Sequence, residues 1–125
     1  MASILIVDDY VVTLRILSTQ LRKGGYEVVT AGNGKEAISR IGERNFDLAI
    51  IDIAMPDMDG ITLLQKLRTE YGQSTLPIIM LTASALDEDR ILAQKAGATD
   101  FLTKPISSWE LLEVVHRQLT KVQLG

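Results

Sequence analysis

Residues that can do chemistry follow four of the apolar runs in this chain. Asp8 and Asp9 follow the first run, Asp52 ends the third, Thr82 follows the fourth and Lys104 follows the fifth. Each has an ordinary structural explanation when taken alone, and an aspartate pair before a helix usually caps it. Together they supply carboxylates, a hydroxyl and an amine, with no histidine or cysteine among them. All-oxygen ligands of this kind favour a hard cation.

Three carboxylates in one pocket would repel one another unless a cation compensates their charge. Mg²⁺ suits such a site because it accepts two or three protein ligands and keeps waters that a phosphate can displace. With Mg²⁺ and the Lys104 ammonium, the formal charge of the pocket is zero, so an anionic phosphoryl group can enter. A carboxylate nucleophile, a divalent cation and a lysine are the groups that aspartyl-phosphate formation requires.

The elements that must position these residues alternate along the chain. Apolar runs at 4–7, 26–30, 47–52, 77–81 and 99–102 predict strands. Amphipathic stretches at 11–21, around 37–41, at 61–71, at 86–96 and after Pro105 predict helices. Strands that are apolar throughout must be covered on both faces, which indicates a parallel sheet between two layers of helices. Right-handed crossovers then give a doubly wound (βα)₅ sandwich of the α/β class.

The carboxyl ends of parallel strands meet at one edge of such a sheet, and this edge is where ligands bind. We therefore expect the five polar residues to converge there. Local signals support the helix boundaries: Asn33 with Glu36 and Ser107 with Glu110 resemble capping boxes, and Gly97 is placed to end a helix.

Composition narrows the function further. The chain has 125 residues, 46% of them hydrophobic, no cysteine and a formal net charge of −3. One domain of this size needs no disulfides, and a mildly acidic surface disfavours direct binding to nucleic acid or to an anionic membrane. The sequence shows neither a run of about 20 apolar residues nor a basic leader, so we expect a cytoplasmic protein.

Four segments carry a family resemblance. They are 4–9, 52–60, 81–83 and 97–105, which read ILIVDD, DIAMPDMDG, LTA and GATDFLTKP. In this order and spacing the chain resembles the receiver domain of two-component response regulators over residues 3–121. The resemblance implies a strand order of 2-1-3-4-5 and one receiver domain at 1–125, with no output domain.

The resemblance also implies roles for the metal and phosphoryl ligands. Asp52 is the phosphoacceptor, and Asp8, Asp9, Asp52 and the backbone carbonyl of Ala54 hold Mg²⁺. Lys104 pairs with the phosphoryl group.

The same resemblance implies a switch. The Thr82 hydroxyl and the backbone N–H of Ala83 bind the phosphoryl group, and the Phe101 ring changes rotamer in response. Ala54 and Ser84 occupy the two positions that tune the lifetime of the phosphoryl group. The family's cis peptide falls at Lys104–Pro105.

The predicted function is a switch phosphorylated by a histidine kinase or a histidine phosphotransfer protein. Phosphorylation would alter the surface of the fourth helix, the fifth strand and the last helix, with no catalysis beyond the receiver's own phosphorylation and dephosphorylation. Val114 replaces the arginine that the DNA-binding subfamily carries in its last helix, so we expect a monomer or weak dimer. The sequence does not name the downstream target.

Two alternatives belong to other functional classes. One is an interaction module that does not use phosphate. Degenerate receivers of this kind lack one of the acidic residues or the lysine, whereas this chain keeps all five key positions. The other is a phosphohydrolase with an aspartyl nucleophile. The haloacid-dehalogenase type needs a second aspartate two residues after the first, and Ala54 stands there.

Overall fold

Strands and helices alternate from one end of the chain to the other in the computed structural model, which describes residues 1–83 and 87–124. The strands are β1 (Ser3–Val7), β2 (Glu27–Ala31), β3 (Leu48–Asp52), β4 (Ile78–Thr82) and β5 (Asp100–Thr103). The helices are α1 (Val11–Lys23), α2 (Gly34–Glu43), α3 (Gly60–Thr69), α4 (Asp87–Lys95) and α5 (Ser108–Leu124). The predicted alternation is confirmed.

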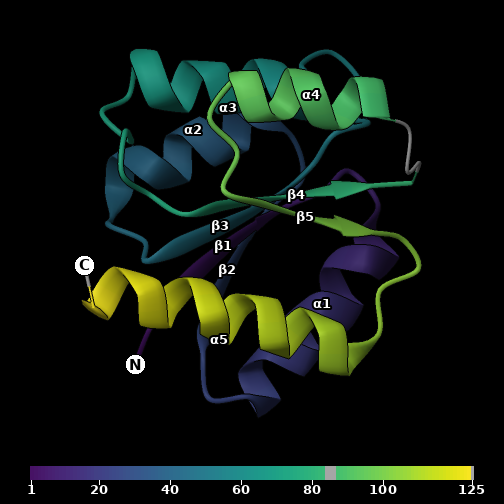
Figure 1. Cartoon of the computed structure of the whole chain (residues 1–125), viewed down its shortest axis with the longest axis vertical. Coiled ribbons are helices and arrows are strands. Elements are labelled where there is room, and N and C mark those ends of the chain that lie inside the picture. Colours follow the sequence, from purple (N-terminus) through teal and green to yellow (C-terminus); the bar gives the residue numbers. More distant parts are fainter. Residues whose placement is uncertain (84–86, 125) are drawn as a thin grey trace.

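The five strands form one parallel sheet in the order β2-β1-β3-β4-β5. Helices α1 and α5 cover one face of this sheet, and α2, α3 and α4 cover the other (Figure 1). Both the predicted fold class and the strand order are therefore correct. Strands β1 and β3 lie inside the sheet, which is why both are buried at every position.

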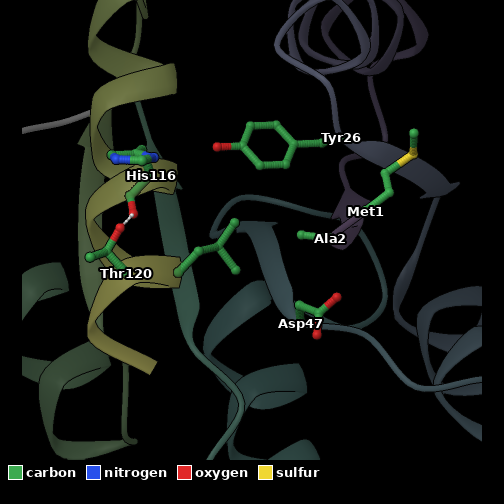
Figure 2. A pocket seen from close by; sticks show the side chains of 7 residues that line it. Met1, Ala2, Tyr26, Asp47, His116 and Thr120 are labelled. Atoms are coloured by element: carbon green, nitrogen blue, oxygen red, sulfur yellow. Dashed lines mark hydrogen bonds between the residues drawn. The ribbon is translucent and has the colours of Figure 1, made fainter. Parts of the chain in front are cut away.

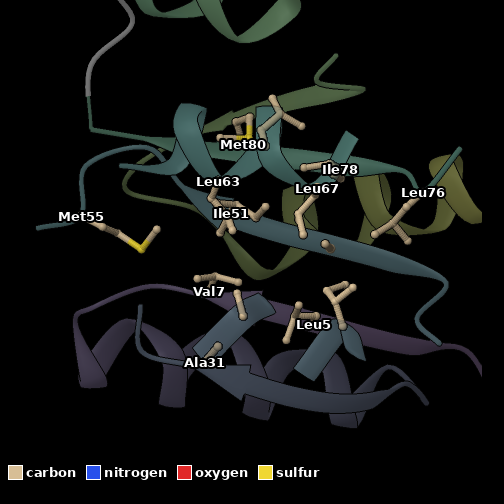
Figure 3. Close-up of a cluster of buried hydrophobic side chains, with 14 of the residues drawn as sticks. Leu5, Val7, Ala31, Ile51, Met55, Leu63, Leu67, Leu76, Ile78 and Met80 are labelled. Carbon is tan, nitrogen blue, oxygen red and sulfur yellow. The ribbon is translucent and has the colours of Figure 1, made fainter. Parts of the chain in front are cut away.

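Successive residues of each inner strand supply two separate cores. On β1, Ile4 and Ile6 pack with helices α1 and α5, whereas Leu5 and Val7 pack with α2, α3 and α4. Figure 3 shows the second cluster, in which Leu5, Val7 and Ile51 gather with leucines of α3. Burying one such side chain stabilises the fold by about 1.5–3 kcal/mol. This two-sided burial explains why the strands lack a polar alternation.

Local capping fixes where the helices begin. The Asn33 side chain accepts a hydrogen bond from the Glu36 N–H at 2.8 Å, and Ser107 Oγ accepts one from Glu110 N–H at 3.1 Å. The predicted caps are confirmed, with one difference: the Glu36 carboxylate accepts from the N–H of Gly32 at 3.2 Å rather than from that of Asn33. Gly97 adopts φ +104° after α4, a conformation that favours glycine.

Some boundaries differ from those predicted. Strands β2, β4 and β5 each begin and end one residue later than expected, because pairing with the neighbouring strand sets the ends. Helix α3 ends at Thr69, which leaves Tyr71 outside it and partly exposed. The predicted start of the fourth helix at residue 86 lies outside the described residues. Among the described helices, none has the length and hydropathy to cross a membrane.

Candidate functional site

The carboxyl edge of the sheet brings the predicted residues together. Asp8 and Asp9 follow β1, Asp52 is the last residue of β3, Thr82 is the last of β4, and Lys104 follows β5. The neighbouring strands end in register, since Asp52 pairs with Leu81 and Thr82 with Thr103. The topology therefore brings five polar residues from the ends of four strands to the same edge, two of them from β1.

Three carboxylates form the acidic part of this site. Oxygen atoms of Asp8, Asp9 and Asp52 all lie within 4.8 Å of one another. Asp8 is fully buried and Asp52 is 4% exposed, whereas Asp9 lies open to solvent. One accessible and two buried oxygen ligands, with no nitrogen or sulfur among them, fit a hard cation that keeps some of its waters.

Lys104 places its ammonium against the two buried carboxylates. Its Nζ lies 3.1 Å from Asp8 Oδ2 and 3.4 Å from Asp52 Oδ2. Burial alone would lower the pKa of Lys104, but the hydrogen bond to Asp8 and the charge of Asp52 outweigh it and raise the pKa above its usual value. Lys104 therefore remains a cation at the site.

Asp52 is the carboxylate with the most perturbed protonation. Burial, followed by the negative charge of Asp8, raises the pKa of Asp52 from 3.8 to about 6, although Lys104 opposes the shift. One ammonium thus does not fully compensate two buried carboxylates. A cation bound between them would favour the ionised form of Asp52.

Asp8 is held by the sheet, and neither residue of the acidic pair is the N-cap of α1. The N-cap residue of α1 is Tyr10, and no side chain caps this helix. The Asp8 N–H instead donates to the Ala31 carbonyl at 3.1 Å, and Asp8 Oδ1 accepts from Tyr10 N–H at 3.0 Å. These bonds turn the Asp8 carboxylate inward toward Lys104. The ordinary explanation of the pair as a helix cap is wrong.

The other predicted residues surround this cluster. Thr82 is buried, and its backbone carbonyl accepts from Lys104 N–H at 2.8 Å. Ala54 and Ala83 are exposed beside the edge, and Phe101 is half-buried against the core. The Lys104–Pro105 peptide is cis, as expected. Ser84 lies outside the described residues.

Gly60 is a site residue whose role the sequence did not indicate. A Cβ at Gly60 would lie 2.1 Å from the backbone oxygen of Asp52, so only glycine lets α3 begin this close to β3. The Gly60 N–H also donates to the Ile53 carbonyl at 2.8 Å. Position in the sequence does not reveal this role, because the close approach of Gly60 to the Asp52 backbone arises only on folding.

Arg90 is a second unexpected residue. Its guanidinium lies 5.5 Å from the centroid of the Phe101 ring, and its Nη2 lies 3.3 Å from Thr103 Oγ1. Arg90 therefore connects α4 to the aromatic residue of the predicted switch. No motif marks it in the sequence.

His116 takes no part in this cluster. It is exposed on α5 and lines a cavity of about 450 Å³ at the opposite end of the sheet, where the strands begin. Figure 2 shows the Tyr26 hydroxyl directed toward His116 across this cavity, with Asp47 below. Asp47 already accepts a hydrogen bond from the N–H of Ser3 at 2.7 Å. His116 is therefore a solvent-exposed histidine of α5, away from the acidic cluster.

Comparison with known proteins identifies the class to which this fold and site belong. The family model of the response regulator receiver domain matches residues 4–116. The chain is therefore a member of the response-regulator receiver family, as its sequence motifs indicated.

Individual relatives agree with this assignment. A probable transcriptional regulator, ycf27, of Cyanophora paradoxa is 45% identical over 120 residues, which cover 96% of this chain and 49% of the relative. The transcriptional regulatory protein GltR of Pseudomonas aeruginosa is 37% identical over 121 residues, or 97% of this chain and 50% of that protein. The chain thus spans about half the length of these curated relatives.

Solved structures show the same fold. The chemotaxis protein CheY4 of Vibrio cholerae is 35% identical, with a TM-score of 0.90 over 94% of this chain and 98% of that one. A CheY-like receiver domain protein of Methanospirillum hungatei is 33% identical, with a TM-score of 0.93 over 100% and 99% of the two chains.

Proposed function

We propose that Asp52 accepts a phosphoryl group and that this event switches the surface formed by α4, β5 and α5. The observation that carries the proposal is the Asp52 carboxylate, which is buried beside two further carboxylates with an ammonium 3.4 Å away. Membership of the receiver family supports a phosphorylation-dependent switch.

The proposed donor is a phosphohistidine on a histidine kinase or a histidine phosphotransfer protein. An Asp52 oxygen attacks the phosphorus, a P–O bond forms, and the P–N bond breaks with its electron pair passing to the imidazole. The product is an acyl phosphate on Asp52. Only the ionised carboxylate is a nucleophile, so transfer needs a pH above the pKa of about 6 in the metal-free site, or a cation that lowers it.

The cation that fits the acidic cluster is Mg²⁺. Asp8, Asp9 and Asp52 would hold it through carboxylate oxygens, and Ala54 through its backbone carbonyl. When bound, it supplies positive charge that offsets the carboxylates and the incoming phosphoryl oxygens. Lys104, whose ammonium lies 3.4 Å from Asp52, supplies the remaining positive charge.

The switch follows from the residues around the phosphoryl position. The Thr82 hydroxyl and the Ala83 backbone N–H would bind phosphoryl oxygens, which draws the end of β4 toward Asp52. Phe101 lies on the neighbouring strand and would turn further into the space that this movement leaves. Because Arg90 contacts Phe101 from α4, the change reaches the helix that forms part of the exposed surface.

The proposed role is signalling in the cytoplasm rather than catalysis on a separate substrate. The curated relatives are regulators of about twice the length, and the receiver would act on a partner or on further domains according to its phosphorylation. For the isolated receiver we propose a monomer or weak dimer without direct contact to nucleic acid.

Labelling with acetyl phosphate and Mg²⁺ tests the role of Asp52. Asp52→Asn should remove the acid-labile, hydroxylamine-sensitive label, because the amide is not a nucleophile, while the fold is kept. Asp57→Asn is the matched control, since Asp57 is an exposed aspartate in the loop after β3. Equal labelling of wild type and Asp52→Asn would overturn the proposal and favour an interaction module that does not use phosphate.

A further inference from the structure

A second pocket lies between α1 and the edge strand β2, apart from the acidic cluster. Its volume is about 270 Å³. Arg15, Ser18, Thr19 and Arg22 of α1 line it together with Thr30 of β2, and Val11 and Leu14 form its apolar end. Positions 15, 18, 19 and 22 share one face of a helix, so the two arginines flank the hydroxyls along a single stripe.

The charges of this stripe are not neutralised within the protein. Within the described chain, neither Arg15 nor Arg22 forms a salt bridge. Helix α1 has no acidic residue, although the whole chain carries a net charge of −3. Arg22 donates through Nη2 to the Val28 carbonyl at 3.3 Å, which holds its guanidinium against β2. The pocket is therefore a positively charged place on an acidic protein.

Ser18 supplies an independent observation. It is only 4% exposed, and its Oγ has no hydrogen-bond partner among the described residues. A buried hydroxyl is normally paired, and a serine inside a helix usually donates to the carbonyl four residues before it. Neighbouring Thr19 does this, since its Oγ1 donates to the Arg15 carbonyl at 2.8 Å. The buried Ser18 Oγ is thus an unused donor on a residue that lines the pocket together with the two arginines.

We propose that this pocket binds an oxyanion, the phosphate or carboxylate group of a small ligand. Guanidinium groups donate paired, charge-assisted hydrogen bonds to both kinds of group, and the Ser18 hydroxyl would donate one more. Val11 and Leu14 would contact a short apolar part of the same ligand. The proposal does not depend on phosphorylation of Asp52, because none of these residues belongs to the acidic cluster.

The site also adjoins the backbone that positions Asp8. Thr30 precedes Ala31, whose carbonyl accepts the hydrogen bond from Asp8 N–H. Val11 lies at the start of α1, three residues after Asp8. A ligand in the pocket would therefore contact two residues, Val11 and Thr30, that lie close to Asp8 along the chain or through the Asp8–Ala31 hydrogen bond.

Titration of the metal-free protein by NMR tests the proposal. Inorganic phosphate in one series and propionate in another are added at constant ionic strength set with chloride. Saturable shifts of the Ser18 and Thr30 amides and of the Arg15 side-chain N–H are expected in at least one series. The series that responds shows whether the ligand group is a phosphate or a carboxylate. Absence of saturable shifts in both would overturn the proposal, as would shifts confined to Lys104 and its neighbours.

Three variants separate binding in the pocket from general attraction to α1. Arg15→Gln and Arg22→Gln should each weaken binding by about tenfold, the effect of losing one charge-assisted interaction. Lys23→Gln is the matched control, because it removes the same charge from the same helix without lining the pocket. Equal weakening by Lys23→Gln would show that only the charge of the helix matters and would overturn the proposal.

Ser18→Ala examines the hydroxyl itself. It should weaken binding about threefold to tenfold, a loss typical of one hydrogen bond. It should leave the melting temperature of the free protein unchanged or higher, because Ser18 Oγ has no hydrogen-bond partner to lose among the residues that the structure describes. Unchanged affinity together with a lower melting temperature would show that Ser18 has a structural role and would overturn its place in the site.

Discussion

The interior of the sheet and its carboxyl edge are formed by the same strands, but burial of side chains has opposite effects on stability in the two places. Strand β3 is buried at every position, and its apolar residues Leu48 to Ile51 lie in two cores, yet its last residue is an aspartate that is also buried. In the interior, each buried group adds stability through the area that it removes from water. At the edge, burial of carboxylates works against stability and raises the pKa of Asp52. The site is therefore a locally unfavourable region held in place by a favourable one.

Shortening a core residue should have the largest effect on stability. Leu67 lies on the buried face of α3, in the core between this helix and the sheet. Leu67→Ala should lower the free energy of unfolding by about 2–5 kcal/mol, because it removes buried methyl groups and leaves a cavity. Leu92→Ala on α4 is the control, since Leu92 is 55% exposed, and its effect should stay within about 0.5 kcal/mol. Urea unfolding of both variants measures the difference, and similar losses would contradict the contrast between core and surface.

Replacing the buried Asp52 carboxyl should raise the free energy of unfolding rather than lower it. The folded state raises the pKa of Asp52 to about 6, so it favours the protonated carboxyl and is penalised when Asp52 ionises. This penalty is absent below the unfolded pKa of 3.8 and is complete above about 6. Asp52→Asn should therefore stabilise the metal-free protein at pH 7, by an amount of order 1–3 kcal/mol.

The pH dependence distinguishes this electrostatic effect from altered packing. The stabilisation by Asp52→Asn should fade as the pH is lowered toward 4, and thermal unfolding in a chelator at several pH values would measure it. A stability difference that is the same at pH 4 and pH 7 would show that the ionisation of Asp52 does not cause it.

Asp9 should affect cation binding more than folding. Because Asp9 is exposed and caps no helix, Asp9→Ala should change the stability of the metal-free protein by less than about 0.5 kcal/mol. The same variant should weaken Mg²⁺ binding about tenfold or more, since it removes one of the three carboxylates. Calorimetric titration with Mg²⁺ gives the affinity, with Asp57→Asn as the control. A clear loss of metal-free stability would indicate a structural role for Asp9.

The smallest expected effect is that of replacing Arg90, which connects the carboxyl edge of the sheet to α4 through the Phe101 ring. Arg90→Gln removes the contact with the Phe101 ring, and for two partly buried side chains such a contact contributes about 0.5–2 kcal/mol. The Phe101 ring should then sample more orientations, which NMR spectra of the ring protons would report. Arg117→Gln is a control on α5, because Arg117 pairs with Asp100 and not with the ring. Unchanged ring spectra in Arg90→Gln would exclude Arg90 from the switch.

The sequence predicted the fold because each signal was local or was repeated along the chain. Apolar strands alternating with amphipathic helices permit few arrangements, and residues at the ends of parallel strands must meet at one edge. This is why Asp8, Asp52 and Lys104 could be placed in one site although 96 positions separate Lys104 from Asp8. The exact ends of β2, β4 and β5 could not be predicted, since they depend on the neighbouring strand.

Tertiary structure alone decided which contacts hold the site in place and how its charges offset one another. Gly60 is required by the approach of α3 to Asp52, and Arg90 reaches Phe101 only because α4 packs beside β5. The pKa of Asp52 depends on how far burial and Asp8 outweigh Lys104. Such quantities are set by distances of a few ångströms between segments far apart in the chain. A sequence pattern specifies which elements form and in which order, whereas these distances follow from how the side chains of those elements pack.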